Sequence, residues 1–97
     1  MRLDDKVIIV TGGGSGIGAA SATAFAAAGA SVVVAGRTLS KVEAIAEQIQ
    51  SDGGQAIPVQ ADVANSADVQ AMVGTAVDSY GRLDVLFNNA GISPSGT

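Results

Sequence analysis

Residues Thr11 to Gly18, TGGGSGIG, carry the clearest chemical signal in this sequence of 97 residues. Five of these eight residues are glycine, and they separate an apolar, β-branched segment from an alanine-rich one. Glycine lets a phosphate approach the backbone closely, and the free N–H groups at the start of a following helix attract anions. The segment therefore predicts a loop that binds a phosphate-containing ligand.

The spacing of the glycines excludes two common phosphate loops. A P-loop has Lys and then Ser or Thr after its last glycine, but Ala19 and Ala20 follow Gly18. The usual dinucleotide fingerprint, G-x-G-x-x-G, is also out of register. The pattern present is T-G-x-x-x-G-x-G, beginning at Thr11. A flexible turn without a ligand is the alternative, but a glycine loop at the first crossover of a β-α-β unit favours a dinucleotide.

Strands and helices are predicted to alternate around this loop. Short apolar runs indicate buried strands, and the segments between them have helical composition or periodicity. Such alternation predicts an α/β fold with a parallel, Rossmann-like sheet of four strands in the order 3-2-1-4 and three crossover helices. The predicted strands are 6–11, 31–35, 56–60 and 83–87, and the predicted helices are 17–28, 40–51 and 66–80.

Local signals predict where the helices begin and end. Ser40 and Glu43 match a capping box, and Asn65 is a candidate N-cap for the last helix. Gly29 and Gly81 follow helical segments, where glycine commonly ends a helix. Pro58 cannot donate a hydrogen bond to a neighbouring strand, so its strand is expected at an outer edge of the sheet.

Composition excludes several classes of function. The net charge is −4, which disfavours nucleic-acid binding, and no apolar run approaches the roughly 20 residues that cross a membrane. The chain has no Cys and no His, which removes thiolate chemistry, the commonest general base and the usual zinc sites. We expect a single domain over residues 1–97, no metal site, and a cytoplasmic protein.

Several motifs in the correct order resemble the short-chain dehydrogenase/reductase family. They are the glycine loop, Asp62-Val63 after the third predicted strand, and YGRLDVLFNNAG at 80–91. The resemblance covers roughly residues 3–93, and it implies the NAD(P)-binding, N-terminal portion of such an enzyme. A complete member would transfer hydride between a nicotinamide cofactor and a carbonyl or alcohol substrate.

The resemblance also implies roles for individual residues. The loop would line the pyrophosphate and the adenosine ribose through Gly12, Gly14, Ser15 and Ile17, while Gly16 and Gly18 would permit the turn and tight packing of helix against strand.

Beyond the loop, Asp62 would accept a hydrogen bond from the adenine amino group, with Val63 against the ring. For Asp62 a structural cap before the next helix is the alternative. Asn88 would tie the fourth strand to its neighbours, and the adenosine side of the cofactor would be flanked by Asn89, Ala90 and Gly91.

The end of the second predicted strand bears on the choice of cofactor. A free ribose is usually held there by Asp or Glu, but this sequence has Gly36 followed by Arg37. Without a carboxylate to repel a 2′-phosphate, and with a guanidinium that can pair with it bidentately, NADP(H) is favoured over NAD(H). The alternative for Arg37 is a solvated surface charge.

The catalytic pattern of the family, Tyr-x-x-x-Lys, does not occur in these residues. Tyr80 is the single tyrosine, the residue four positions later is Asp84, and Tyr80 lies on the apolar stripe of its helix. The sequence therefore predicts a cofactor-binding portion that is not catalytic by itself. It is expected to be a piece of a full-length reductase or a truncated or naturally short chain; the alternative is a stand-alone nucleotide-binding or self-associating scaffold module.

The fourth predicted strand also bears on assembly. Its apolar residues would form an open edge of the sheet, and open edges recruit partners. We expect the chain to associate with itself, either through an antiparallel pair of these strands across a two-fold axis or through the helix at 66–80.

Overall fold

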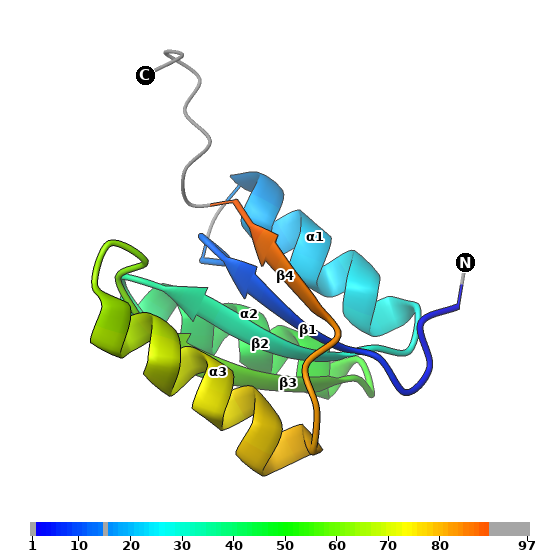
Figure 1. The fold of residues 1–97 in the computed structure, drawn as a ribbon. Coiled ribbons are helices and arrows are strands. Elements are labelled where there is room, and N and C mark those ends of the chain that lie inside the picture. Colours follow the sequence, from blue (N-terminus) through cyan, green and yellow to red (C-terminus); the bar gives the residue numbers. More distant parts are fainter. Residues whose placement is uncertain (1, 15, 90–97) are drawn as a thin grey trace.

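The computed structural model describes residues 2–14 and 16–89, in which four parallel strands alternate with three helices (Figure 1). The sheet order β3-β2-β1-β4 confirms the predicted topology. The bounds of the elements are β1 Val7–Thr11, α1 Gly16–Ala27, β2 Ser31–Gly36, α2 Leu39–Ser51, β3 Gln55–Gln60, α3 Ser66–Tyr80 and β4 Val85–Asn88.

Helices cover both faces of the sheet, and the alternation of side chains along β1 divides the core between them (Figure 1). Ile8 and Val10 pack with residues of α1 and α2, whereas Val7 and Ile9 face α3. Because both faces are covered, every residue of β1 is buried. The first crossover therefore leaves the glycine loop at the carboxyl end of a fully buried strand.

Pro58 lies in β3, which is the outer strand next to β2. Its missing N–H therefore removes no hydrogen bond from the interior of the sheet. The expected edge position is confirmed.

The helix boundaries correct one prediction. Helix α2 has Thr38 at its N-cap, so the capping box predicted at Ser40 and Glu43 is wrong. The turn after β2 begins the helix earlier than predicted, and the N–H groups of Lys41 and Val42 already donate to the Thr38 carbonyl. Ser40 is therefore inside the first turn rather than before it.

The other predicted ends of helices agree with the structure. Asn65 caps α3, its side chain accepting the Asp68 N–H at 3.1 Å. Gly81 ends α3 in the left-handed region at φ 82°, and Gly29 follows α1 at φ 106°.

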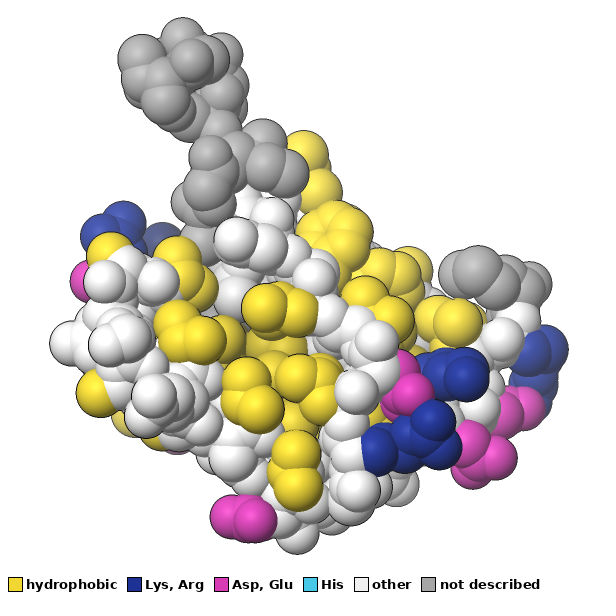
Figure 2. Space-filling model, in the orientation of Figure 1, with side chains coloured by type: hydrophobic (Ala, Val, Ile, Leu, Met, Phe, Trp, Pro, Cys, Tyr) yellow, Lys and Arg dark blue, Asp and Glu magenta, His cyan; other side chains and the backbone are white. Residues whose placement is uncertain are grey.

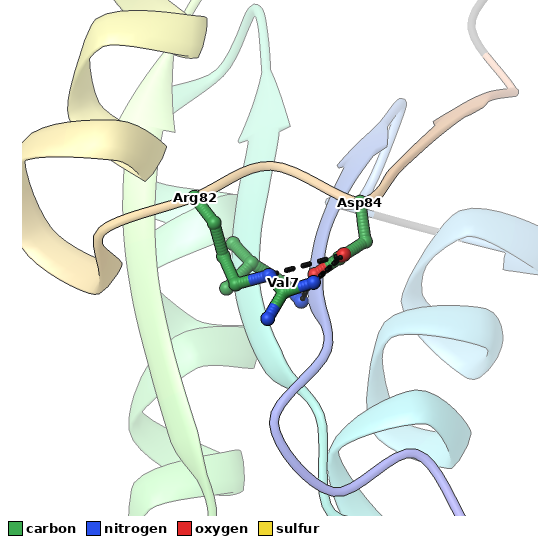
Figure 3. Close-up of polar contacts among 3 residues, drawn as sticks. All are labelled: Val7, Arg82 and Asp84. Atoms are coloured by element: carbon green, nitrogen blue, oxygen red, sulfur yellow. Dashed lines mark hydrogen bonds and ion pairs between the residues drawn. The ribbon is translucent and has the colours of Figure 1, made fainter.

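Strand β4 is held to β1 at its start by Asp84 (Figure 3). Its carboxylate accepts the Val7 N–H at 2.8 Å and two hydrogen bonds from Arg82, while its own N–H donates to the Val7 carbonyl. The Val7 N–H first, and then the Arg82 guanidinium, lower the pKa of Asp84 below its ordinary value, and partial desolvation opposes them. Asp84 thus sets where the pairing of β4 with β1 begins.

None of the helices in the described part of the chain is both long and apolar enough to span a membrane.

Candidate cofactor site

A cavity of about 310 Å³ lies where β1, β2 and β3 end. The carboxyl ends of parallel strands are where open α/β sheets bind ligands. Residues from these three strand ends and the turns after them line the cavity: Thr11, Gly12, Ala35, Gly36, Arg37, Ala61, Asp62 and Val63.

The glycine loop packs too tightly for side chains at three of its positions, Gly13, Gly14 and Gly18. A Cβ at Gly18 would overlap the Gly12 carbonyl oxygen and would lie 3.0 Å from Asn89 Nδ2. A Cβ at Gly13 would lie 2.7 Å from Val34 Cγ1. Gly12 and Gly16 have φ of 65° and 58°, in the left-handed region that favours glycine. The loop therefore presents bare backbone beside the cavity.

Thr11 joins this loop to the end of β4. Its side chain is buried, and its hydroxyl donates to Asn88 Oδ1 at 3.0 Å and accepts the Asn89 N–H at 2.9 Å. This contact confirms that Asn88 ties β4 to its neighbour. It also places Asn89 over Gly18, so two motifs that lie more than 70 residues apart in the sequence meet here.

Asp62 forms the structural turn considered for it and also lines the cavity. Its Oδ1 accepts the Ala64 N–H at 2.9 Å, and its own N–H donates to Asp68 Oδ2 at 2.9 Å. These contacts form the turn that leads into α3, which is the structural role. Among the described residues nothing donates to Asp62 Oδ2, and the residue lines the cavity, so this oxygen is available to a ligand donor.

Arg37 directly follows β2 and lines the cavity. Its backbone carbonyl accepts a hydrogen bond from Gln60 Nε2 at 3.1 Å, which fixes the main chain just after β2. Its side chain is exposed and has no ion pair among residues 2–14 and 16–89. The guanidinium is therefore free to meet an anion from outside.

The family model for short-chain dehydrogenases matches residues 6–97. The chain belongs to the short-chain dehydrogenase family. It is 51% identical over 90 residues to an uncharacterized oxidoreductase of Mycobacterium tuberculosis (strain CDC 1551 / Oshkosh), covering 93% of this chain and 34% of that protein. The chain thus spans about a third of the length of that relative.

Other members of the short-chain dehydrogenase family differ in length. The Bacillus subtilis (strain 168) short-chain dehydrogenase/reductase homolog YusS is 45% identical over 94 residues, which are 96% of this chain and 86% of YusS. A solved structure of 7α-hydroxysteroid dehydrogenase with NADH and 7-oxo glycochenodeoxycholic acid superposes with a TM-score of 0.85 and 39% identity. That match covers 88% of this chain and 33% of the dehydrogenase.

The residues present fit the nicotinamide dinucleotide that this family uses. Bare loop backbone suits a pyrophosphate, because Gly12 lines the cavity without a side chain and Gly16 begins α1, where free N–H groups attract anions. Ala35, Ala61 and Val63 offer an apolar wall for a flat ring, next to the carboxylate of Asp62. Within the described ranges no group of three acidic, His or Cys side chains is arranged to hold a metal ion.

The structure gathers most of the residues that the sequence singled out. Gly12, Arg37, Asp62 and Val63 line the main cavity, and Gly14 lines a smaller one beside it. The start of α1 holds Gly16, Gly18 and Ile17, and the Ile17 side chain is 64% exposed. The predicted contacts Ser15, Ala90 and Gly91 lie outside the described residues.

Sequence reasoning missed two contributors. Gly13 was given no role, yet its N–H donates to the Ala35 carbonyl and its position tolerates no side chain. Thr11 was treated only as the first letter of a motif, although its buried hydroxyl connects the loop to β4. The sequence offered one signal for the role of Thr11: Thr11 and Asn88 are polar residues that each end an apolar strand.

Proposed function

We propose that this chain is the NADP(H)-binding portion of a short-chain dehydrogenase/reductase. The observation that carries the proposal is the cavity of about 310 Å³ in which the glycine loop, Arg37 and Asp62 meet. In the complete enzyme, the bound nicotinamide would accept or donate the hydride exchanged with a carbonyl or alcohol substrate. The residues here bind and orient the adenosine and pyrophosphate of that cofactor.

The preference for NADP(H) rests on the end of β2. Gly36 supplies no carboxylate to the ribose, and a Cβ there would already lie 3.0 Å from the buried Val42 Cγ1. Arg37 follows it and lines the cavity. A guanidinium pairs with a phosphate monoester through two parallel hydrogen bonds, so a 2′-phosphate gains a contact that NAD(H) lacks.

Hydride chemistry in this family also needs a proton donor, and Tyr80 does not fit that role. Its side chain packs against the core under α3, and burial raises its pKa. Asp84, four positions later, binds Val7 and Arg82 rather than supplying an ammonium. We expect these 97 residues to bind cofactor without turning over a carbonyl substrate by themselves.

Calorimetric titration with NADP⁺ and NAD⁺ tests the cofactor assignment. NADP⁺ should bind about tenfold more tightly, and Arg37→Ala should remove most of that difference, because a hydrogen bond to a charged group contributes about 1.5–3 kcal/mol. Arg2→Ala is the matched control, since Arg2 pairs with Asp4 away from the cavity. Equal affinities that ignore Arg37→Ala would overturn the NADP(H) assignment, and turnover by the chain alone would overturn its catalytic incompleteness.

A scaffold that associates with itself is the second candidate, favoured by β4. Val85 and Leu86 are 45% and 46% exposed, on opposite faces of β4. Among residues 2–14 and 16–89, β4 pairs with β1 alone. Figure 2 shows the hydrophobic face formed by α3 and β4. A second copy could pair with this edge, or pack against α3 around the exposed Val77. We place either form in the cytoplasm, where a chain without cysteine needs no disulfide.

Sedimentation separates the two modes of self-association. Leu86→Lys should dissociate a dimer formed through β4, and Val77→Lys one formed through α3. A stable monomer at micromolar concentration would refute both modes. Absence of any affinity for NADP⁺, NAD⁺ or ADP-ribose, together with a stable dimer, would favour the scaffold over the reductase portion.

A further inference from the structure

A second cavity, of about 140 Å³, adjoins the main one on the side of α2. The two cavities share Gly12, Gly36 and Arg37, so a ligand that fills the main cavity can extend a substituent into the smaller one. The described residues that line the smaller cavity are Gly12, Gly14, Gly36, Arg37, Thr38, Lys41 and Val42.

Charge distinguishes the two sides of Arg37. Of the described residues, two cations, Arg37 and Lys41, and no carboxylate line the smaller cavity. On its other side Arg37 borders a hollow lined also by Asp62 and Asp68. Lys41 has no ion pair within residues 2–14 and 16–89. An anionic substituent is therefore drawn toward the α2 side and repelled from the α3 side.

The main chain at Lys41 is well fixed. Its N–H donates to the Thr38 carbonyl at 3.1 Å in the first turn of α2. Its Cβ lies directly against the glycine loop, since a Cβ added at Gly14 would be 2.8 Å from it. The flexible stem of the lysine thus starts at the wall of the cavity, which lowers the cost of placing its ammonium there.

We propose that Lys41 is a second cationic contact for the 2′-phosphate of NADP(H), acting together with Arg37. This inference rests on the proposed NADP(H) function. The second pKa of a phosphate monoester is about 6, so the group carries roughly 1.5 to 2 negative charges near pH 7. One guanidinium therefore neutralises only part of this charge. Arg37 would donate two parallel hydrogen bonds from its planar guanidinium, and Lys41 would add the positive charge of its ammonium.

The test compares adenosine 2′,5′-bisphosphate with 5′-ADP as probes of the 97-residue chain by calorimetry. Lys41→Gln should weaken binding of the 2′,5′-bisphosphate roughly fivefold, as expected for one exposed charge pair of about 1 kcal/mol. Binding of 5′-ADP should change less than twofold, because it has no 2′-phosphate. Lys41→Arg should retain the selectivity.

Lys6→Gln is the matched control. It removes the other lysine of the chain, which lies just before β1. The cavity lies at the far end of β1, about 17 Å away along the strand. Both affinities should stay within twofold of the wild type.

The outcomes separate this inference from the function on which it rests. If the wild type does not prefer the 2′,5′-bisphosphate, the NADP(H) assignment itself fails. If the wild type prefers it and Arg37→Ala removes the preference, but Lys41→Gln leaves it unchanged, the role of Lys41 alone is overturned. An equal loss for both probes in Lys41→Gln would likewise overturn the assignment of Lys41 to the 2′-phosphate.

Discussion

Strands β1 and β4 are neighbours in the sheet, yet their environments differ. Residues of the two strands lie side by side in parallel register, from Ile8 and Val85 to Thr11 and Asn88. All of β1 is buried, whereas β4 is exposed at Val85, Leu86 and Asn88. The same hydrogen-bond ladder therefore joins a strand enclosed by helices to the outer strand of the sheet that the described residues form.

This difference means that the glycine loop and the end of β4 are held in place by different kinds of interaction. The glycine loop follows a strand that is fixed by packing from both faces. Asn88 and Asn89 lie at the end of a strand that is held mainly by specific contacts. These are Asp84 at its start, Thr11 at its end, and an edge-to-face contact of Phe87 with Phe25 at 5.5 Å between ring centroids. Packing should therefore dominate the stability of β1, and single polar contacts that of β4.

Truncating the side chains of two residues paired across β1 and β4, Ile9 and Leu86, should give the largest difference in the free energy of unfolding. Ile9 is fully buried and its partner Leu86 is 46% exposed, and both face the α3 side. Ile9→Ala should lower the free energy of unfolding by about 2–5 kcal/mol, because it leaves a cavity in the core. Leu86→Ala should lower it by about 1 kcal/mol or less. Urea denaturation measures both changes.

Ile9→Val is a milder substitution that keeps the comparison measurable if Ile9→Ala does not fold. It should cost about 0.5–1.5 kcal/mol. Equal losses for Ile9→Ala and Leu86→Ala would contradict the comparison, and would mean that β4 is as well covered in solution as β1.

The junction of the two strands can be tested at Gly18. A side chain there would overlap the Gly12 carbonyl and crowd Asn89, so Gly18→Ala should cost about 1–3 kcal/mol and weaken NADP⁺ binding more than tenfold. Gly74→Ala is the control, because nothing lies within 4 Å of a Cβ at that helical position. It should stabilise the chain by about 0.5–1 kcal/mol and leave binding unchanged.

Binding in Gly18→Ala should be measured below its unfolding transition, so that loss of affinity is not loss of fold. Unchanged affinity in the folded variant would show that the loop and Asn89 can move apart without harm to the site.

Much of the fold could be predicted because hydrophobic pattern and turn chemistry agree. The β-branched runs of β1 and β2, the missing N–H of Pro58 and the cap at Asn65 each act locally, so the sequence shows them directly. The start of α2 could not be placed in this way. Ser40 and Glu43 have the spacing of a capping box, but the turn that leaves β2 begins the helix at Leu39.

The site was less visible because its contacts join distant segments. The loop spacing and Arg37 could be found along the chain, whereas the hydroxyl of Thr11 acquires its role only when β4 lies beside β1. Lys41 was given no role from the sequence, because its place at a cavity wall depends on how α2 packs against Gly14.

The smallest expected effect is the pH dependence contributed by Asp84. Its pKa is lowered in the folded chain, chiefly by the Val7 N–H and also by Arg82, from an ordinary value of 3.8. The ionised carboxylate therefore stabilises the fold above that value, and this contribution is lost as the pH falls through the lowered pKa. Asp84→Asn should reduce stability at pH 7, and the difference from wild type should shrink as the pH falls below about 4.

Denaturation at pH 7, 5 and 3 measures this effect, with Asp78→Asn on the exposed surface of α3 as the control. The control should follow the wild type at every pH. If the Asp84→Asn difference were the same at pH 7 and pH 3, Asp84 would stabilise the fold through the geometry of its hydrogen bonds rather than through its charge. Because Asp84 contacts Val7 and not the loop, any loss of NADP⁺ affinity in this variant should vanish once the folded fraction is taken into account.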